Sequence, residues 1–204
     1  MRVIVAILLI SISATTAKTI FNSSYDAFRL TNVHKFNSND SLVLWQPNRK
    51  LKWDDYKGIP DTNSSYMALT YTTVEITPRN YNESTVEYSI SCSFESNLSW
   101  SKNKLSNELL KHEQIHFDIA ELTIRKMRKK FINYRFLNLE DAGEKILKFA
   151  DEAREERRKL NFDYDEKTNH GINITEQKKW QSYIAFELKK YSKYSYSIVK
   201  MKKK

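Results

Sequence analysis

Cysteine is almost absent from this sequence, since Cys92 is the only one in 204 residues. No disulfide can form within the chain, so its stability must come from packing. The sequence also lacks a glycine-rich phosphate loop, a zinc knuckle and a basic helix with interleaved aromatic residues. These absences argue against a nucleic-acid-binding protein.

Long hydrophobic runs are missing as well. The apolar run at residues 3–12 is only about half of the roughly 20 residues that a membrane-spanning helix needs. It follows Arg2 and precedes the small residues at 14–17, which is the pattern of a secretory signal peptide. We therefore expect residues 1–17 to be cleaved, leaving a secreted or periplasmic protein without a stable membrane anchor. Residues 18–40 are polar and are expected to form a connecting arm.

Positive charge is in excess, with a formal net charge of +9 and a pI near 9.4. Part of this excess comes from lysines near the C-terminus, and residues 199–204 are predicted to be a solvated basic tail. A basic surface permits contact with an anionic cell envelope, although charge alone is an argument about solubility and steering.

Residues 41–198 are expected to form one α+β domain. Short β runs occur at 42–45 and 51–53, and two stronger strands are predicted at 66–77 and 85–95. Because residues 78–83 have turn chemistry, the two stronger strands should form an antiparallel hairpin. Apolar residues alternate in the second of them, so Cys92 is interpreted as a buried core thiol rather than a reactive nucleophile.

The second half of the domain is predicted to be helical. Residues 101–134 contain no glycine or proline and carry an apolar stripe at helical spacing. The opposite face is expected to be exposed to solvent and contains Asn107, Gln114, Asp118, Glu121, Arg125, Arg128 and Lys129. A second helix is expected at 139–160, and a third from Asn173, whose spacing to Glu176 is that of a capping box. The antiparallel sheet should pack against the long first helix and the two further helices.

The first predicted helix contains a motif with chemical meaning, in which His112, Glu113 and His116 form the pattern His-Glu-x-x-His. Residues four apart lie on one face of a helix, so both imidazoles can reach one zinc ion. Glu113 is rotated by roughly 100° and lies beside the metal, where a general base can take a proton from water. Two buried core histidines would be the alternative, but they would leave Glu113 unexplained.

A catalytic zinc ion usually has a third protein ligand. Of the two remaining histidines, His34 lies in the predicted arm, whereas His170 lies in a loop just before the third helix. We therefore predict His170 as the third ligand, with a carboxylate such as Asp163 or Asp165 as the alternative.

Several segments resemble a known domain family: Lys52-Trp53 with Asp54 and Tyr56, the motif segment 110–119, Tyr164-Asp165, His170-Gly171, Gln177 and Trp180. Over residues 40–195 the chain resembles the DUF922 family, described as predicted secreted zinc-dependent proteases. The resemblance implies His112 and His116 as ligands and Glu113 as the base, and it supports His170 as the third ligand. It implies no particular substrate.

These observations predict a secreted zinc metallopeptidase with one Zn²⁺ per chain and a peptide or protein substrate. Tyr164 could stabilise an oxyanion near the metal, although a packing role is favoured for it. One alternative is a cell-wall amidase with the same zinc chemistry. The other is a non-catalytic zinc-binding interaction protein. A purely structural zinc site would normally have four ligands and no adjacent glutamate, which argues against this alternative.

Overall fold

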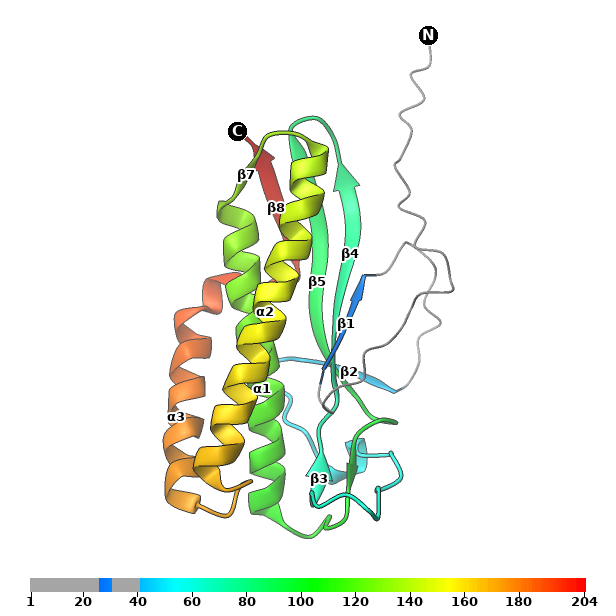
Figure 1. The fold of residues 1–204 in the computed structure, drawn as a ribbon, viewed down its shortest axis with the longest axis vertical. Coiled ribbons are helices and arrows are strands. Elements are labelled where there is room, and N and C mark those ends of the chain that lie inside the picture. Colours follow the sequence, from blue (N-terminus) through cyan, green and yellow to red (C-terminus); the bar gives the residue numbers. More distant parts are fainter. Residues whose placement is uncertain (1–25, 31–40) are drawn as a thin grey trace.

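The computed structural model describes residues 26–30, by their backbone, and residues 41–204. Its fold is α+β, with three long helices on one side and a mainly antiparallel sheet on the other (Figure 1). This confirms the predicted fold class. The predicted signal peptide, and the predicted arm apart from 26–30, lie outside the described residues.

The predicted hairpin forms the centre of the sheet. Strands β4 (Thr72–Tyr81) and β5 (Thr85–Glu95) pair antiparallel over most of their length. Apolar residues of β5 alternate into the core as predicted: Val86, Ile90, Cys92 and Phe94. Cys92 is a free cysteine that is 1% exposed, which confirms that it is a core residue.

Short strands complete the main sheet: β1 (Asp26–Leu30), β2 (Leu42–Leu44) and β7 (Arg135–Phe136). β1 pairs in parallel with β4, so the predicted arm contains a strand. A separate two-stranded sheet joins β3 (Ala68–Leu69) to β6 (Trp100–Ser101), which divides the predicted strand at 66–77 into β3 and β4. The short β run predicted at 51–53 is wrong, because Trp53–Asp55 form the 3-10 helix η1.

The prediction of a solvated tail at residues 199–204 is also wrong. Ile198–Lys203 form strand β8, which pairs antiparallel with β5 and parallel with β7. Val199 and Met201 are buried while the lysines between and after them are exposed. Apolar residues alternate with lysines here at the period of a strand, so one face of β8 can join the core.

Three helices follow the predicted order: α1 (Asn107–Asn133), α2 (Leu139–Thr168) and α3 (Ile174–Lys190). Asn173 caps α3 as predicted, its side chain accepting a hydrogen bond from the backbone N–H of Glu176. The second helix continues eight residues beyond its predicted end at Leu160. That extension brings the last two turns of α2 alongside α1. No helix within residues 41–204 combines the length and the apolar character that crossing a membrane requires.

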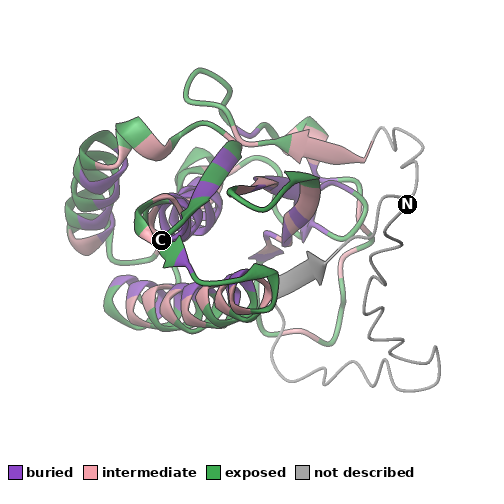
Figure 2. Cartoon of the chain, turned by 90° about the horizontal axis from the view of Figure 1, so that it is seen from above, coloured by how far each residue is buried: buried purple, intermediate pink, exposed green. Residues whose placement is uncertain are grey.

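Helix α1 lies between the sheet and the other two helices (Figure 2). Most of the face that was assigned to water is therefore buried: Gln114, Asp118, Glu121, Arg125 and Arg128. Glu121 forms ion pairs with Arg125 and Arg128 at 2.8 and 2.9 Å. Arg128 also donates to the carbonyl oxygen of Ile90 in β5. These charges can be buried because each has partners of opposite charge or hydrogen-bond acceptors.

Candidate metal centre

Three side chains from two helices meet near the first turns of α1. The Nε2 atoms of His112 and His116 lie 3.2 Å apart. The Oδ1 atom of Asp165, in α2, lies 3.2 Å from Nε2 of His112 and 3.1 Å from Nε2 of His116. All three residues are buried, and together they form a group that could hold a metal ion.

The spacing of these atoms fits a zinc ion. Ligand atoms about 2.0–2.1 Å from zinc at the corners of a tetrahedron lie about 3.3 Å apart. The three observed separations of 3.1, 3.2 and 3.2 Å come close to that value. Two imidazoles and one carboxylate are also a ligand set of catalytic zinc sites, in which the fourth position stays open. The donor set and its geometry thus suit a metal ion with one free coordination position.

Hydrogen bonds behind the two rings direct their Nε2 atoms toward the group. Nδ1 of His116 lies 3.1 Å from Oδ1 of Asn161, and Nδ1 of His112 lies 3.3 Å from Oε1 of Gln177. Because each partner atom is an acceptor, each Nδ1 carries the proton. The lone pair of each Nε2 then faces Asp165, as metal-ligating histidines require.

Tyr164 supports the site from behind instead of facing a substrate. Its ring stacks on His112 with centroids 4.6 Å apart, and its hydroxyl donates to Oε1 of Gln177 at 2.7 Å. The residue is fully buried, and burial raises the pKa of its phenol, with Glu113 adding to the effect. The packing role that the sequence favoured for Tyr164 is confirmed.

The charges of the group favour a bound cation. Burial lowers the pKa of His116, but Asp165 outweighs this and raises the pKa to about 9. Burial raises the pKa of Asp165, but His116 and His112 outweigh it and hold the pKa of that carboxyl well below its usual range. The site therefore keeps an ionised carboxylate at neutral pH, and its negative potential attracts a proton or a metal ion.

Glu113 lies next to this group but is not part of it. It follows His112 on α1 and is 3% exposed. Its Oε2 atom is buried and makes no hydrogen bond with any residue that the structure describes. A buried carboxylate oxygen without a partner is costly, which suggests that its partner is a bound molecule.

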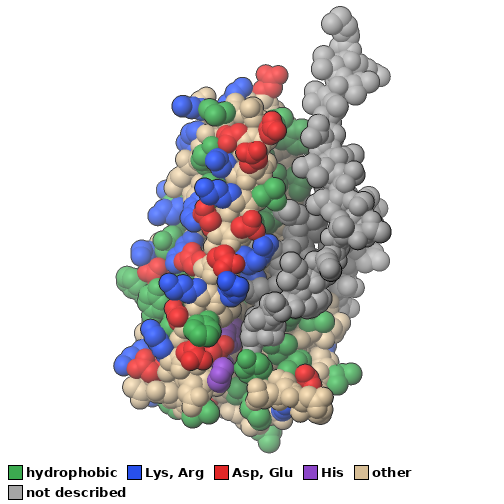
Figure 3. Space-filling view, viewed as in Figure 1, with side chains coloured by type: hydrophobic (Ala, Val, Ile, Leu, Met, Phe, Trp, Pro, Cys, Tyr) green, Lys and Arg blue, Asp and Glu red, His purple; other side chains and the backbone are tan. Residues whose placement is uncertain are grey.

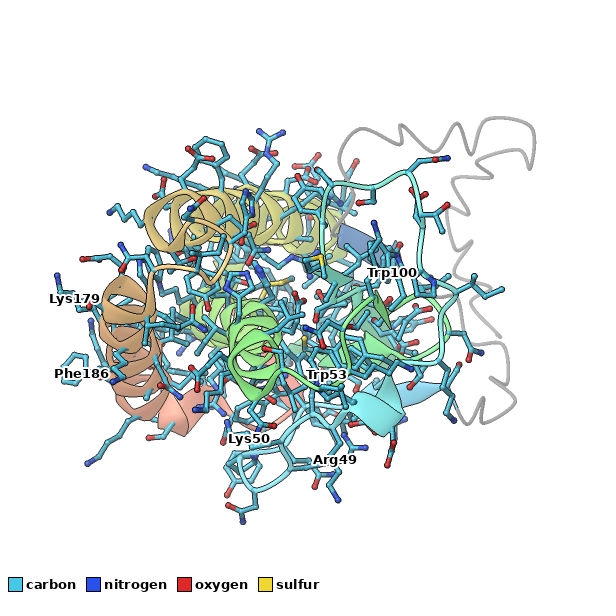
Figure 4. The ribbon with its side chains drawn as sticks, turned by 90° about the horizontal axis from the view of Figure 1, so that it is seen from below. Arg49, Lys50, Trp53, Trp100, Lys179 and Phe186 are labelled. Carbon is cyan, nitrogen blue, oxygen red and sulfur yellow. The ribbon has the colours of Figure 1, made fainter. Side chains whose placement is uncertain are left out.

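An open cavity of about 400 Å³ leads to the group. Residues 65–68 line one wall, residues 170–172 line the other, and the start of α1 forms the floor with His112 and Glu113. Seen from this end, α1 lies in the middle, with Trp100 of β6 on the side away from α3 (Figure 4). Histidine side chains reach the surface at the same end of the molecule, between acidic and apolar residues (Figure 3).

The structure corrects the predicted third ligand. His170 is not in the group that could hold a metal, and its Nδ1 atom lies 3.9 Å from Oδ1 of Asp165. Asp165, the carboxylate alternative, takes that place, and Asp163 does not. The reason is the extra length of α2, which keeps residue 165 on a helix facing α1 rather than in a loop.

A signal for this arrangement was present in the sequence. Tyr164, Asp165 and Thr168 follow Asn161 at spacings of three, four and seven residues, which places all four on one helix face. All four are buried. Continuing the helical period past Leu160 would have identified both the third candidate ligand, Asp165, and the partner of His116, Asn161.

Fold and site together define an α+β protein with a candidate metal centre of two histidines and one aspartate on neighbouring helices. The chain belongs to the family described as bacterial proteins of unknown function, DUF922, which it matches over residues 48–171. The matched region includes Glu113 and all three candidate ligands, and it ends before Gln177. No curated protein and no solved structure matches the chain.

Proposed function

We propose that this protein is an exported zinc-dependent peptidase in which His112, His116 and Asp165 hold the metal. The observation that carries the proposal is the partnerless, buried Oε2 of Glu113 beside three converging ligand atoms at the base of an open cavity. A zinc ion held there would act as a Lewis acid, activating water and polarising a carbonyl group.

Glu113 supplies the acid–base step. Its carboxylate takes a proton from the attacking water and later delivers it to the amine that leaves. With a metal ion bound the two histidines would be neutral, and Asn161 and Gln177 orient their rings by accepting the Nδ1 protons. A purely structural metal site would not need a glutamate beside the ligands. The position of Glu113 therefore favours catalysis over a non-catalytic zinc protein.

The wall formed by β3 favours a peptide as substrate. The backbone N–H of Lys102 donates to the carbonyl oxygen of Met67 at 2.8 Å, so residues 67 and 102 form a hydrogen-bonded pair. In an antiparallel ladder the next pair, Ala68 with Ser101, directs its N–H and C=O groups outward. Ala68 lines the cavity, so an extended peptide could pair with this edge.

Two measurements test the proposal. Elemental mass spectrometry should find about one zinc ion per purified chain, and His116→Ala should lose it. Glu113→Gln should keep its zinc but cleave a peptide library about 10²–10⁴-fold more slowly than the parent. Glu108→Gln is the matched control, because this exposed glutamate lies on the same helix and lines the same cavity.

The outcomes separate the alternatives. Cleavage of peptidoglycan but of no peptide would favour the amidase. Iron instead of zinc would point to oxygenase chemistry, for which two histidines and a carboxylate also serve. A folded protein that binds no metal after reconstitution would refute the proposal.

A further inference from the structure

The turn between α2 and α3 has an unusual backbone. Asn169, His170 and Gly171 have φ values of +47°, +50° and +85° in succession. Glycine adopts this region readily and asparagine often does at the end of a helix, but for other residues it costs roughly 1–2 kcal/mol. His170 is therefore the strained residue, and strain of this kind gathers at functional sites.

The turn is held in place from both sides. The backbone N–H of His170 donates to the carbonyl oxygen of Asp165 at 2.9 Å, and that of Asn173 donates to Thr168 at 2.7 Å. Gly171 lies directly on the ring of His112, and a Cβ atom at Gly171 would be 3.0 Å from Cγ of that ring. His170 and Gly171 are thus tied to two members of the metal group, Asp165 and His112.

This backbone places the side chain of His170 in the cavity. It lines the cavity, and 48% of it is exposed. Its Nδ1 lies 3.9 Å from Oδ1 of Asp165, too far for a hydrogen bond. Its ring meets Tyr66 of the opposite wall edge-on, with centroids 5.5 Å apart. The imidazole of His170 therefore lies at the mouth of the metal group and makes no hydrogen bond with any residue that the structure describes.

Hydrolysis of an amide needs a donor at that place. As the water oxygen bonds to the carbonyl carbon and its proton passes to Glu113, the carbonyl π electrons move onto the carbonyl oxygen. This oxygen gains negative charge, and a prepositioned donor stabilises it. When the tetrahedral species collapses, the C–N bond breaks and the amine leaves with the proton from Glu113.

The donors of the two ligand histidines and of Tyr164 are already engaged. Both ring nitrogens of His112 and of His116 are directed to acceptors or to the metal position, and the hydroxyl of Tyr164 is held by Gln177. Among the residues that the structure describes, no lysine or arginine lines the cavity.

We propose that His170 is a catalytic residue which donates an N–H hydrogen bond to the substrate oxygen that becomes negative. A neutral imidazole is sufficient for this role. The inference rests on the proposed hydrolase function and assigns His170 to the substrate instead of the metal.

The test compares His170→Asn, which tolerates the left-handed backbone but whose short amide reaches only to the position of Nδ1, with His170→Gln, whose longer amide places an N–H near the position of Nε2, the donor nitrogen. Ile174→Ala, an exposed residue at the start of α3 that does not line the cavity, is the control. Zinc content should stay at the parent value in all three proteins. Acetohydroxamate, an anionic zinc-binding probe, should bind zinc-loaded His170→Asn about 10–100-fold more weakly, by calorimetry. The kcat for peptide cleavage should fall about 10²–10³-fold with little change in KM, and His170→Gln should recover part of both losses.

Each outcome bears on a different statement. If His170→Asn loses zinc, the residue is a ligand and the inference is overturned. If the variant keeps zinc and binds acetohydroxamate as tightly as the parent, the inference is overturned while the proposed function stands. If the parent itself binds neither zinc nor acetohydroxamate, the proposed function fails and takes this inference with it.

Discussion

Replacing Gln177 with alanine should weaken metal binding, although Gln177 does not belong to the ligand group. Gln177 is 3% exposed, and its Oε1 atom accepts hydrogen bonds from the Tyr164 hydroxyl at 2.7 Å and from Nδ1 of His112 at 3.3 Å. Without it the ring of His112 loses the partner that sets its tautomer and its direction. Losses of such partners typically weaken metal affinity about 10–100-fold, or about 1.4–2.7 kcal/mol.

The same substitution should destabilise the metal-free protein by a separate amount. A buried hydroxyl and a buried imidazole N–H lose their shared acceptor, which costs about 1–3 kcal/mol of unfolding free energy. The unfolding free energy of the metal-loaded protein should fall by about 1.4–2.7 kcal/mol more, because a more weakly bound metal stabilises the fold less. Urea unfolding with and without zinc separates the two contributions.

Competition with a coloured chelator measures the zinc affinity directly. Gln177→Glu keeps an acceptor for both donors and should bind zinc nearly as well as the parent. Gln181→Ala, one turn further along α3 and exposed, is the control. A folded Gln177→Ala protein with unchanged zinc affinity would show that the ring of His112 is positioned by its packing alone.

Three further expectations concern the turn, the last strand and the metal. Gly171→Ala should lower the unfolding free energy by about 1–3 kcal/mol, because the residue has φ +85° and its Cβ would meet His112. Gly143→Ala, within α2 and with nothing within 4 Å of the added Cβ, should raise the unfolding free energy by roughly 0.5–1 kcal/mol. Denaturant unfolding measures both changes, and a change of the opposite sign in either variant would contradict this reasoning. Met201→Ala should cost about 2–5 kcal/mol in the same assay, whereas the exposed Lys202→Ala should stay within about 0.5 kcal/mol; equal effects would contradict the role of β8 in the core. Zinc at about 100 times its Kd should raise Tm by about 5–11 °C, reversibly on chelation, and His116→Ala should show no such shift in a thermal melt.

Local patterns in the sequence were sufficient for much of this fold. The alternation in 85–95 predicted the core face of β5, and the spacing of Asn173 to Glu176 predicted the start of α3. Two of the candidate metal ligands and the adjacent glutamate could be identified from the sequence because they occupy one helix at a fixed spacing. Each of these features depends on residues within a few positions of one another.

The errors arise where distant segments decide the outcome. Glu121 and Arg128 look like residues of a solvent-facing surface, and Arg128 is buried because β5 and η2 (Ser192–Tyr194) pack against α1 and supply the carbonyl oxygens of Ile90 and Tyr194 as acceptors. Glu121 is buried beside it and pairs with it on α1. Asp165 lies beyond the predicted helix end at Leu160, and the asparagine and aspartate residues around it are poor helix formers. They stay helical because Asn161 and Asp165 gain long-range contacts to His116.

Strand β8 also determines when the sheet can be completed during synthesis. The edge of β5 at residues 85–89 stays open while all three helices are being made, and it is covered only when residues 198–203 have emerged. An open strand edge is a template for pairing with other chains. Translation products that stop before residue 198 would therefore carry the motif helix intact and yet be prone to associate through β5.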